Sequence, residues 1–242
     1  MFTHHQEQQA QPFLAVAAFS VGASMGVTQV PSDDHEELNE HALQQADTAL
    51  GRMLAQLTEN NDVETVVIVT AGRGNATSGD PHSSMHERSI NVPLIISGVN
   101  LVPQMINEPV STIDVAPTLL DIADIPKRSR VQGTSLLNTA KPPRGWAMSR
   151  LRRSKKNDSP DTKYNLQTAL RANNLKLIVN HGNTQGGDQI SYRLFDLASD
   201  PEEKNDLVPQ QSYAADLEDM IDLMIDARCA LEDRTEPRIA KF

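Results

Sequence analysis

Four consecutive β-branched residues, Val66 to Val69, lead directly into a glycine-rich turn at residues 70–74. A short apolar run of this kind is typical of a strand that is buried on both faces, and such strands belong to parallel sheets covered by helices. In open α/β sheets, ligands bind just beyond the carboxyl ends of the strands. The chemistry of this chain is therefore expected between Thr70 and Arg88.

The segments around this run predict an α/β fold with a mostly parallel sheet flanked by helices. Residues 13–20 are expected to form a buried strand, and residues 34–57 a helix with one apolar stripe. Residues 65–70 form the next strand, so that strand, helix and strand make a βαβ unit with parallel neighbours. Residues 92–96 are expected to form another buried strand.

The later part of the chain has a different pattern. Ser111 to Asp114 resembles a capping box before a helix that reaches Ala123, and Pro117 is expected to bend or delay this helix. Residues 166–179 and 191–197 have the alternating pattern of an antiparallel hairpin. Residues 214–231 form an amphipathic pattern, so this end of the chain is expected to be a small α+β subdomain.

These patterns divide the chain into four parts. We expect a loose N-terminal tail at residues 1–11, a partial α/β core at 12–140, a basic linker at 141–164 and a C-terminal subdomain at 165–242. The clustered Lys and Arg residues of the linker are interpreted as a solvated surface rather than an anion-binding patch.

Composition excludes several classes of function. The net charge of −10 argues against nucleic acid as the main partner. The single cysteine, Cys229, excludes an internal disulfide and a thiolate metal cluster. The apolar run at residues 13–19 has no Lys or Arg before it, so a strand is favoured over a signal peptide. No run reaches the ~20 apolar residues that a membrane span requires.

Several segments resemble, in order, the motifs of one family. The matched motifs, with the residues of this chain, are QPFFLY (11–14), LDxxIGRLL (46–54), TLVIFTSDHG (66–74), YEESIRVPLII (87–96), VSLVDLAPTLLDLAGI (111–120), AVRTDRYKLI (169–178) and ELYDLxxDPxE (194–203). Through them the chain resembles the C-terminal portion of the sulfatase family, within the alkaline-phosphatase-like superfamily. The resemblance extends from about Gln11 to Ala230.

The resemblance implies a set of site residues that this chain lacks. Sulfatases use a formylglycine nucleophile, made from a Cys or Ser in a CxPSR motif, and Ca²⁺ or Mg²⁺. No such motif is present, and Cys229 lies in the C-terminal helix. The family's Asp-His or Asp-Asn pair falls on Gly72 and Arg73, its Lys on His82, and its APH histidine on about Ala23. Glycine cannot ligate a cation and arginine repels one, so no cofactor is expected.

The altered positions leave two interpretations open. Arg73, His82, His86 and Arg88 could form a small anion-binding pocket. The plainer interpretation makes them ordinary surface residues. Asp114 is interpreted as a helix-capping residue rather than a catalytic one.

Three functions follow from the resemblance. The leading hypothesis is a sulfatase-like pseudoenzyme that is inactive alone, either a degenerate paralogue or a fragment. The second is a sulfuric-ester hydrolase whose N-terminal half is supplied elsewhere, and the third is an interaction module that pairs with a full-length sulfatase. Exposed sheet edges predict self-association or pairing with a missing N-terminal half. Family members are often periplasmic, secreted or lysosomal, and the localisation of this chain is left open.

Overall fold

The computed structural model describes residues 13–18, 35–59, 65–74, 85–98, 101–128, 130–137, 144–153, 165–183 and 190–232. The chain divides into two compact units, Met1–Val67 with Ser97–Leu101 and Ile68–Ile96 with Val102–Phe242. The expected tail at residues 1–11 lies outside the described residues, so it remains a prediction.

Helix α1 (His35–Glu59) confirms the helix predicted at residues 34–57. Ala42, Ala46, Leu50 and Met53 lie on the half-buried stripe, at the three- and four-residue spacing that places side chains on one helix face. Leu43, which falls outside the stripe, is 62% exposed.

The buried strand predicted at residues 13–20 is wrong for the part that is described. Residues 13–18 have no regular secondary structure and are exposed, and residues 19–20 lie outside the described ranges. An apolar run becomes a strand only where a neighbouring strand pairs with its N–H and C=O groups. The composition of residues 13–18 does not reveal whether such a partner strand is present.

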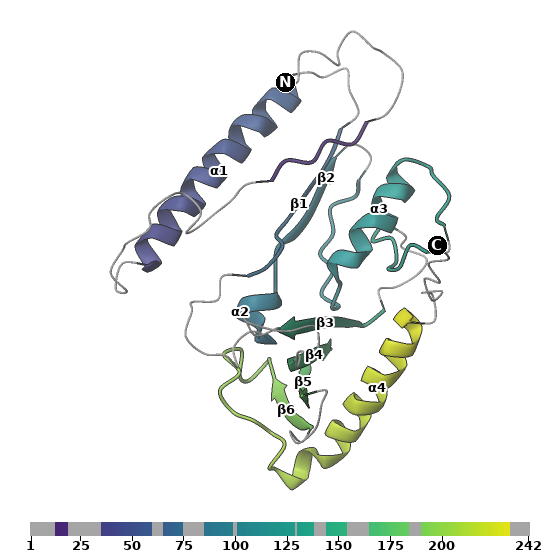
Figure 1. Cartoon of the computed structure of the whole chain (residues 1–242). Helices are drawn as coiled ribbons and strands as arrows, with labels where there is room; N and C mark the ends of the chain where they lie inside the picture. Colours follow the sequence, from purple (N-terminus) through teal and green to yellow (C-terminus); the bar gives the residue numbers. More distant parts are fainter. Residues whose placement is uncertain are drawn as a thin grey trace, which may run out of the picture. The chain divides into compact units, whose positions relative to one another are not determined.

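Strands β1 (Val66–Thr70) and β2 (Leu94–Gly98) form a two-stranded sheet, with helix α2 (Glu87–Ile90) preceding β2 (Figure 1). A Cβ atom at Gly98, where β2 ends, would lie 2.8 Å from the carbonyl oxygen of Thr65, where β1 begins. The two strands therefore run in opposite directions. The side chains of Val66 to Val69 are half-buried rather than buried. The α/β class is confirmed, whereas a mostly parallel sheet is not.

A second sheet contains strands β3 (Trp146–Arg153), β4 (Asn165–Ala172), β5 (Leu175–Asn183) and β6 (Ser191–Asp196) in sequential order. All three pairings are antiparallel. The predicted hairpin at its end is confirmed by β5 and β6. The stretch 166–179, however, is two strands joined at Asn173 and Asn174. Asn173 has a φ of 50°, a conformation that asparagine tolerates in tight hairpin turns.

Strand β3 lies inside the stretch that was expected to be a basic linker at 141–164, so the linker interpretation is wrong for residues 146–153. Trp146 and Met148 pack against the core of this sheet, two residues apart as on one face of a strand. The basic side chains of the stretch masked this alternation. Residues 154–164 lie outside the described part.

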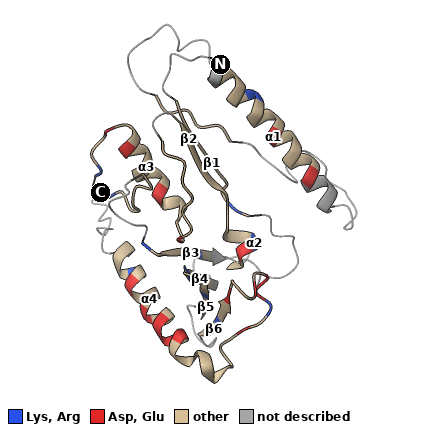
Figure 2. Cartoon of the chain, turned by 180° about the vertical axis from the view of Figure 1, so that it is seen from behind, with Lys and Arg blue, Asp and Glu red and all other residues tan. Residues whose placement is uncertain are grey.

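Helix α4 (Ala214–Glu232) confirms the predicted C-terminal helix and covers one face of the four-stranded sheet (Figure 1). Its inner side chains recur at helical spacing and meet alternate residues of the strands. The buried residues of this layer include Met220, Met224 and Ala227 from α4 and Leu170, Leu177 and Leu194 from the sheet. In Figure 2 several positions along α4 are coloured as acidic residues.

The opposite face of this sheet packs against the segment around α2. Met85 joins Ala169, Ile178 and Phe195 in a second buried cluster, with Ile90 packed beside it. Residues 176–179 of β5 are therefore buried on both faces, which fits the apolar run from Leu177 to Val179.

Helix α3 (Val115–Ile122) is preceded by the 3₁₀ turn η4 (Thr112–Asp114), and a second such turn, η5 (Gln211–Tyr213), precedes α4. The predicted capping box of Ser111 and Asp114 is present. Pro117 is the third residue of α3. The first-turn N–H groups of a helix have no intrahelical partner, so a proline there removes none of the internal hydrogen bonds.

Candidate functional site

The carboxyl end of β1 is occupied by Gly72, Arg73 and Gly74. Gly72 is exposed, and a Cβ atom there would have no neighbour within 4 Å. The side chain of Arg73 is exposed as well. Gly74 is held closely, because its N–H donates to the carbonyl oxygen of Ser89 at 2.9 Å and a Cβ atom would lie 2.1 Å from the carbonyl oxygen of Arg88. The end of β1 is thus fixed to α2 by its backbone.

The other predicted site residues are distributed differently. Ala23 and His82 lie outside the described residues, so their roles remain predictions. Arg88 is exposed, and its Nη2 lies 3.7 Å from Oε1 of Glu202. The structure places Arg88 beside a carboxylate, and the anion-binding pocket with Arg73 stays a prediction.

His86 is half-buried and faces the C-terminal sheet. Its Nε2 lies 3.2 Å from Nη1 of Arg193, and its ring meets the ring of Phe195 edge-on at 5.7 Å. A guanidinium can only donate, so Nε2 accepts the hydrogen bond in the tautomer that fits this contact. Nδ1 lies 4.0 Å from Oε2 of Glu203. His86 is therefore engaged with residues of the same unit on both sides of its ring.

A buried cluster of charged residues lies next to His86, and we call it the charge cluster: Glu87, Arg171, Lys176 and Glu203. The ammonium of Lys176 is fully buried and lies 2.8 Å from Oε1 of Glu203 and 3.0 Å from Oε1 of Glu87. Nη1 of Arg171 lies 2.9 Å from Oε2 of Glu87. Burying charges of this kind is costly unless they are paired, as they are here.

The contacts inside the charge cluster differ in kind. Arg171 donates a hydrogen bond to Glu87, and the backbone N–H of Glu87 donates to Oε2 of Glu203 at 2.5 Å. The approach of Lys176 to the two carboxylates is close, but its Nζ lacks the angles of a directed hydrogen bond within the described structure. Lys176 therefore acts on both carboxylates mainly through its charge.

Sequence reasoning did not weigh Lys176 or Glu203 as site residues. The available signal was a single lysine inside the apolar run Leu175 to Val179, since a lysine there is almost never fully buried unless it is paired. The motifs carried a second signal, because each residue of the charge cluster comes from one of three segments that resemble family motifs. Only the fold brings those three segments together.

Asp114 is buried, and its contacts confirm its interpretation as a capping residue. Its carboxylate accepts the backbone N–H groups of Ser111 at 2.9 Å and Thr134 at 2.8 Å. It also accepts Nη2 of Arg144 at 2.9 Å, and that guanidinium lies over the ring of Trp146. These contacts connect η4 to the two segments that follow α3. Asp114 is thus a structural hub.

His181 lies near the end of the sheet that α4 covers. Its Nε2 is 2.9 Å from Oγ1 of Thr168, which is fully buried. Burial lowers the pKa of His181, and the neighbouring charges of Arg228 and Arg150 lower the pKa further. Its neutral form is therefore favoured in the folded protein.

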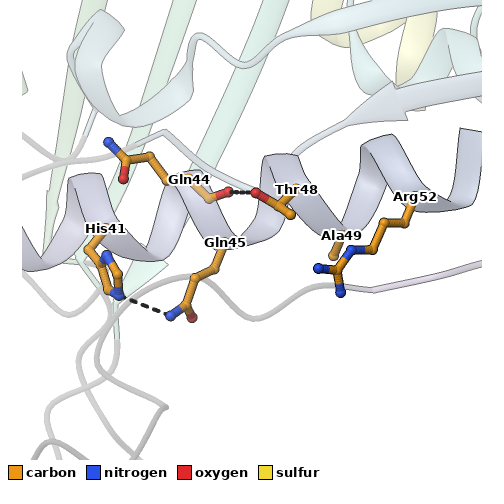
Figure 3. Close-up of a pocket in the computed structure, with 6 residues that line it drawn as sticks. All are labelled: His41, Gln44, Gln45, Thr48, Ala49 and Arg52. Carbon is orange, nitrogen blue, oxygen red and sulfur yellow. Dashed lines mark hydrogen bonds between the residues drawn. The ribbon is translucent and has the colours of Figure 1, made fainter.

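A shallow hollow beside α1 offers little chemistry. Figure 3 shows the described residues that line it, all from this one helix: His41, Gln44, Gln45, Thr48, Ala49 and Arg52. Nε2 of Gln45 pairs with His41 at 3.0 Å, and Oγ1 of Thr48 donates to the carbonyl oxygen of Gln44 at 2.8 Å. Among the residues that the structure describes, no second element contributes a group to this hollow.

The described residues offer neither a cluster of metal ligands nor a helix suited to a membrane. No three His, Cys, Asp or Glu side chains in these ranges gather closely enough to hold a metal ion. Of the helices in the described ranges, none combines the length and apolarity needed to cross a membrane.

Comparison with known proteins identifies the family. The model for the C-terminal part of N-sulphoglucosamine sulphohydrolase matches residues 82–229, and the general sulfatase model matches residues 6–125. The chain belongs to the sulfatase family, which has an alkaline-phosphatase-like fold.

Relatives of known sequence agree with this assignment. Arylsulfatase K of Xenopus laevis is 30% identical over 183 residues, which cover 69% of this chain and 32% of that protein. The uncharacterised sulfatase YidJ of Escherichia coli (strain K12) is 26% identical over 191 residues, covering 77% of this chain and 37% of that protein. The chain thus spans about a third of the length of these relatives.

Solved structures support the fold. The phosphonate monoester hydrolase of Agrobacterium radiobacter superposes with a TM-score of 0.61 at 19% identity, over 86% of this chain and 43% of that one. At this level of identity the likeness concerns the fold alone.

The residues at the carboxyl end of β1 do not fit the divalent cation that the family implies. Ca²⁺ and Mg²⁺ take oxygen ligands, chiefly from carboxylates and carbonyl groups. Gly72 offers no side chain and Arg73 brings a permanent positive charge.

Proposed function

We propose that this chain is a sulfatase-family protein that does not hydrolyse sulfate esters by itself. The observation that supports the proposal is the pair Gly72 and Arg73, exposed at the carboxyl end of β1. There the resemblance places two metal ligands, and this chain has a backbone turn and a guanidinium. Sulfuryl transfer needs a cation to stabilise the charge on the transferring group, and it needs an activated nucleophile.

The nucleophile gives separate support. The chain has one cysteine, Cys229, and no CxPSR motif. Cys229 is exposed near the end of α4, in a helix that resembles no nucleophile-bearing motif.

The test is an assay of the purified chain on a chromogenic aryl sulfate, with Ca²⁺, with Mg²⁺ and with a chelator. We expect no metal-dependent turnover. Arg73→Ala is the matched variant, because Arg73 is exposed and its removal should leave the fold intact. Metal-dependent turnover that co-purifies with the chain would overturn the proposal, whether or not it changes in Arg73→Ala. Turnover that separates from the chain on further purification would come from a contaminating enzyme.

A second candidate function is pairing with a polypeptide that carries the N-terminal part of a sulfatase, which includes both the split-enzyme and the interaction-module hypotheses. The distribution of apolar side chains favours it. Most of the large hydrophobic side chains described as exposed precede the C-terminal sheet, including Leu14, Val16, Leu43, Ile95, Val102 and Met105. The fully buried apolar residues lie mainly between 169 and 227. Exposed apolar surface of this kind often marks a protein interface.

Sedimentation velocity over a range of concentrations tests the pairing. We expect self-association of the isolated chain, reduced when Leu43 and Ile95 are replaced by polar residues. A matched control replaces Ile225, which is also exposed but lies on α4. A monomer at all concentrations, with a cooperative melt well above room temperature, would count against this second candidate.

A further inference from the structure

The charge cluster connects two parts of the chain that are far apart in sequence. Glu87 begins α2, whereas Arg171 and Lys176 lie on β4 and β5, and Glu203 lies in the turn after β6. The backbone N–H of Glu87 reaches Oε2 of Glu203 at 2.5 Å, across 116 residues. The side chain of His86, which precedes the helix, makes no capping hydrogen bond. Glu203 therefore accepts the first N–H group of α2, for which the preceding residue supplies no capping side chain.

Lys176 makes this contact possible. A carboxylate as buried as that of Glu203, with a side chain 1% exposed, is strongly disfavoured unless a cation lies beside it. Lys176 lies between the carboxylates of Glu203 and Glu87, at 2.8 Å and 3.0 Å. Its position on β5 is determined by the register of the sheet, in which Lys176 is opposite Phe195. The sheet thus presents a fixed positive charge to α2.

Glu203 has an unusual backbone conformation. Its φ is 56°, in the left-handed region that residues other than Gly and Asn rarely adopt. Such a conformation persists where the surrounding structure demands it. Here the turn directs the carboxylate of Glu203 inward, whereas the neighbouring Glu202 is half-exposed and lies near Arg88 and Lys204.

Two further contacts extend this connection to the carboxyl end of β1. Glu87 and Ser89 belong to the same short helix, and the carbonyl oxygen of Ser89 accepts the N–H of Gly74 at 2.9 Å. Gly74 packs so tightly on Arg88 that no side chain fits between them. A continuous path of contacts therefore runs from β5 through α2 to the residue that follows Arg73.

We propose that Lys176, Glu203 and Glu87 are positioning residues, through which the C-terminal sheet fixes the carboxyl end of β1, where the candidate site lies. The role is one of placement, because the charged ends of Lys176, Glu203 and Glu87 face one another at 2.8 Å and 3.0 Å in the interior of this unit. The inference holds whether or not the chain hydrolyses sulfate esters, so that it and the proposed function can fail separately.

Amide hydrogen exchange of the full chain, measured residue by residue by NMR, tests the proposal. In Glu203→Gln and in Lys176→Met, we expect exchange at Glu87 and Gly74 to be about tenfold faster or more, since a charge-assisted hydrogen bond is lost. Exchange within β5 should change much less. Glu202→Gln is the matched control, since it alters the adjacent, half-exposed glutamate in the same way.

Each outcome decides the question. Faster exchange at Glu87 without a change at Gly74 would show that the cluster acts only on α2 and would overturn the proposal. An equal acceleration at all sites, including β5, would indicate plain loss of stability and would overturn it too. If a single variant does not fold, Lys176→Met with Glu203→Gln removes both buried charges together, which is better tolerated than removing one. This double variant should fold and should still release Glu87 and Gly74.

Discussion

Replacing Asp114 by alanine should destabilise the protein strongly. Its carboxylate is 4% exposed and holds Arg144, whose side chain is 18% exposed, at 2.9 Å. It also accepts the N–H groups of Ser111 and Thr134. Loss of a capping side chain costs about 1 kcal/mol. Breaking a buried ion pair costs about 3 kcal/mol at the low end of its range, which suits a guanidinium that is partly exposed.

The expected total for Asp114→Ala is therefore about 4 kcal/mol, a large part of the roughly 5–15 kcal/mol that stabilises a typical domain. Asp114→Asn retains the shape and one acceptor oxygen, so its loss should be about half as large. Asp121→Ala is the matched control. It removes an exposed aspartate from α3, the helix that follows Asp114, and it should change the free energy of unfolding by less than about 0.5 kcal/mol.

Urea unfolding followed by the fluorescence of Trp146 measures these changes. Trp146 is the only tryptophan of the chain, and Arg144 lies 4.8 Å from the centre of its ring. The slope of the free energy against urea concentration should stay the same while the midpoint falls. A loss below about 1 kcal/mol in Asp114→Ala, or one equal to that of Asp121→Ala, would refute the assignment of Asp114 as a structural hub.

Two other predictions concern the end of β1 and the pH dependence of stability. Gly74→Ala should lower the melting temperature measured by circular dichroism, because its Cβ atom would lie 2.1 Å from the carbonyl oxygen of Arg88. Gly72→Ala should leave the melting temperature unchanged, because its Cβ atom would have no neighbour within 4 Å. Equal melting temperatures of the two variants would contradict this prediction. The pKa of His181 is lowered from 6.5, first by burial and then by Arg228 and Arg150, so protonation is harder in the folded state than in the unfolded state. The contribution of His181 to stability is thus fully present above pH 6.5 and is lost as the pH falls through its lowered folded-state value. Replacement by Gln should flatten the change in urea midpoint between about pH 8 and pH 5, and an unaltered slope would show that other groups cause it.

Local patterns were sufficient for the elements whose own residues decide their structure. Helix α1, helix α4 and the capping box before α3 were all predictable, because helical spacing and a capping side chain act within a few residues. The family could be identified from the order of motifs. The expectation that Gly72 and Arg73 stand at the family's ligand positions also comes from the sequence alone, and it stays a prediction.

Where pairing over a distance decides the outcome, the sequence was a poorer guide. The run at residues 13–18 has the composition of a strand but is exposed, and residues 146–153 look like a basic linker but form β3. A strand exists only with a partner, and partners are chosen by the whole fold. For the same reason β1 and β2 proved to be antiparallel.

The sequence by itself determined the family and the long helices. Only the tertiary structure decided which charged residues meet. Taken singly, Glu87, Lys176 and Glu203 give no sign of a shared site, and a lysine such as Lys176 is unexpected within an apolar run. They become a buried cluster because the antiparallel register of the C-terminal sheet and the turn after β6 place three distant segments at one point. The energy of a charge pair depends on the distance between its two charged groups, and for residues far apart in sequence only the fold sets that distance.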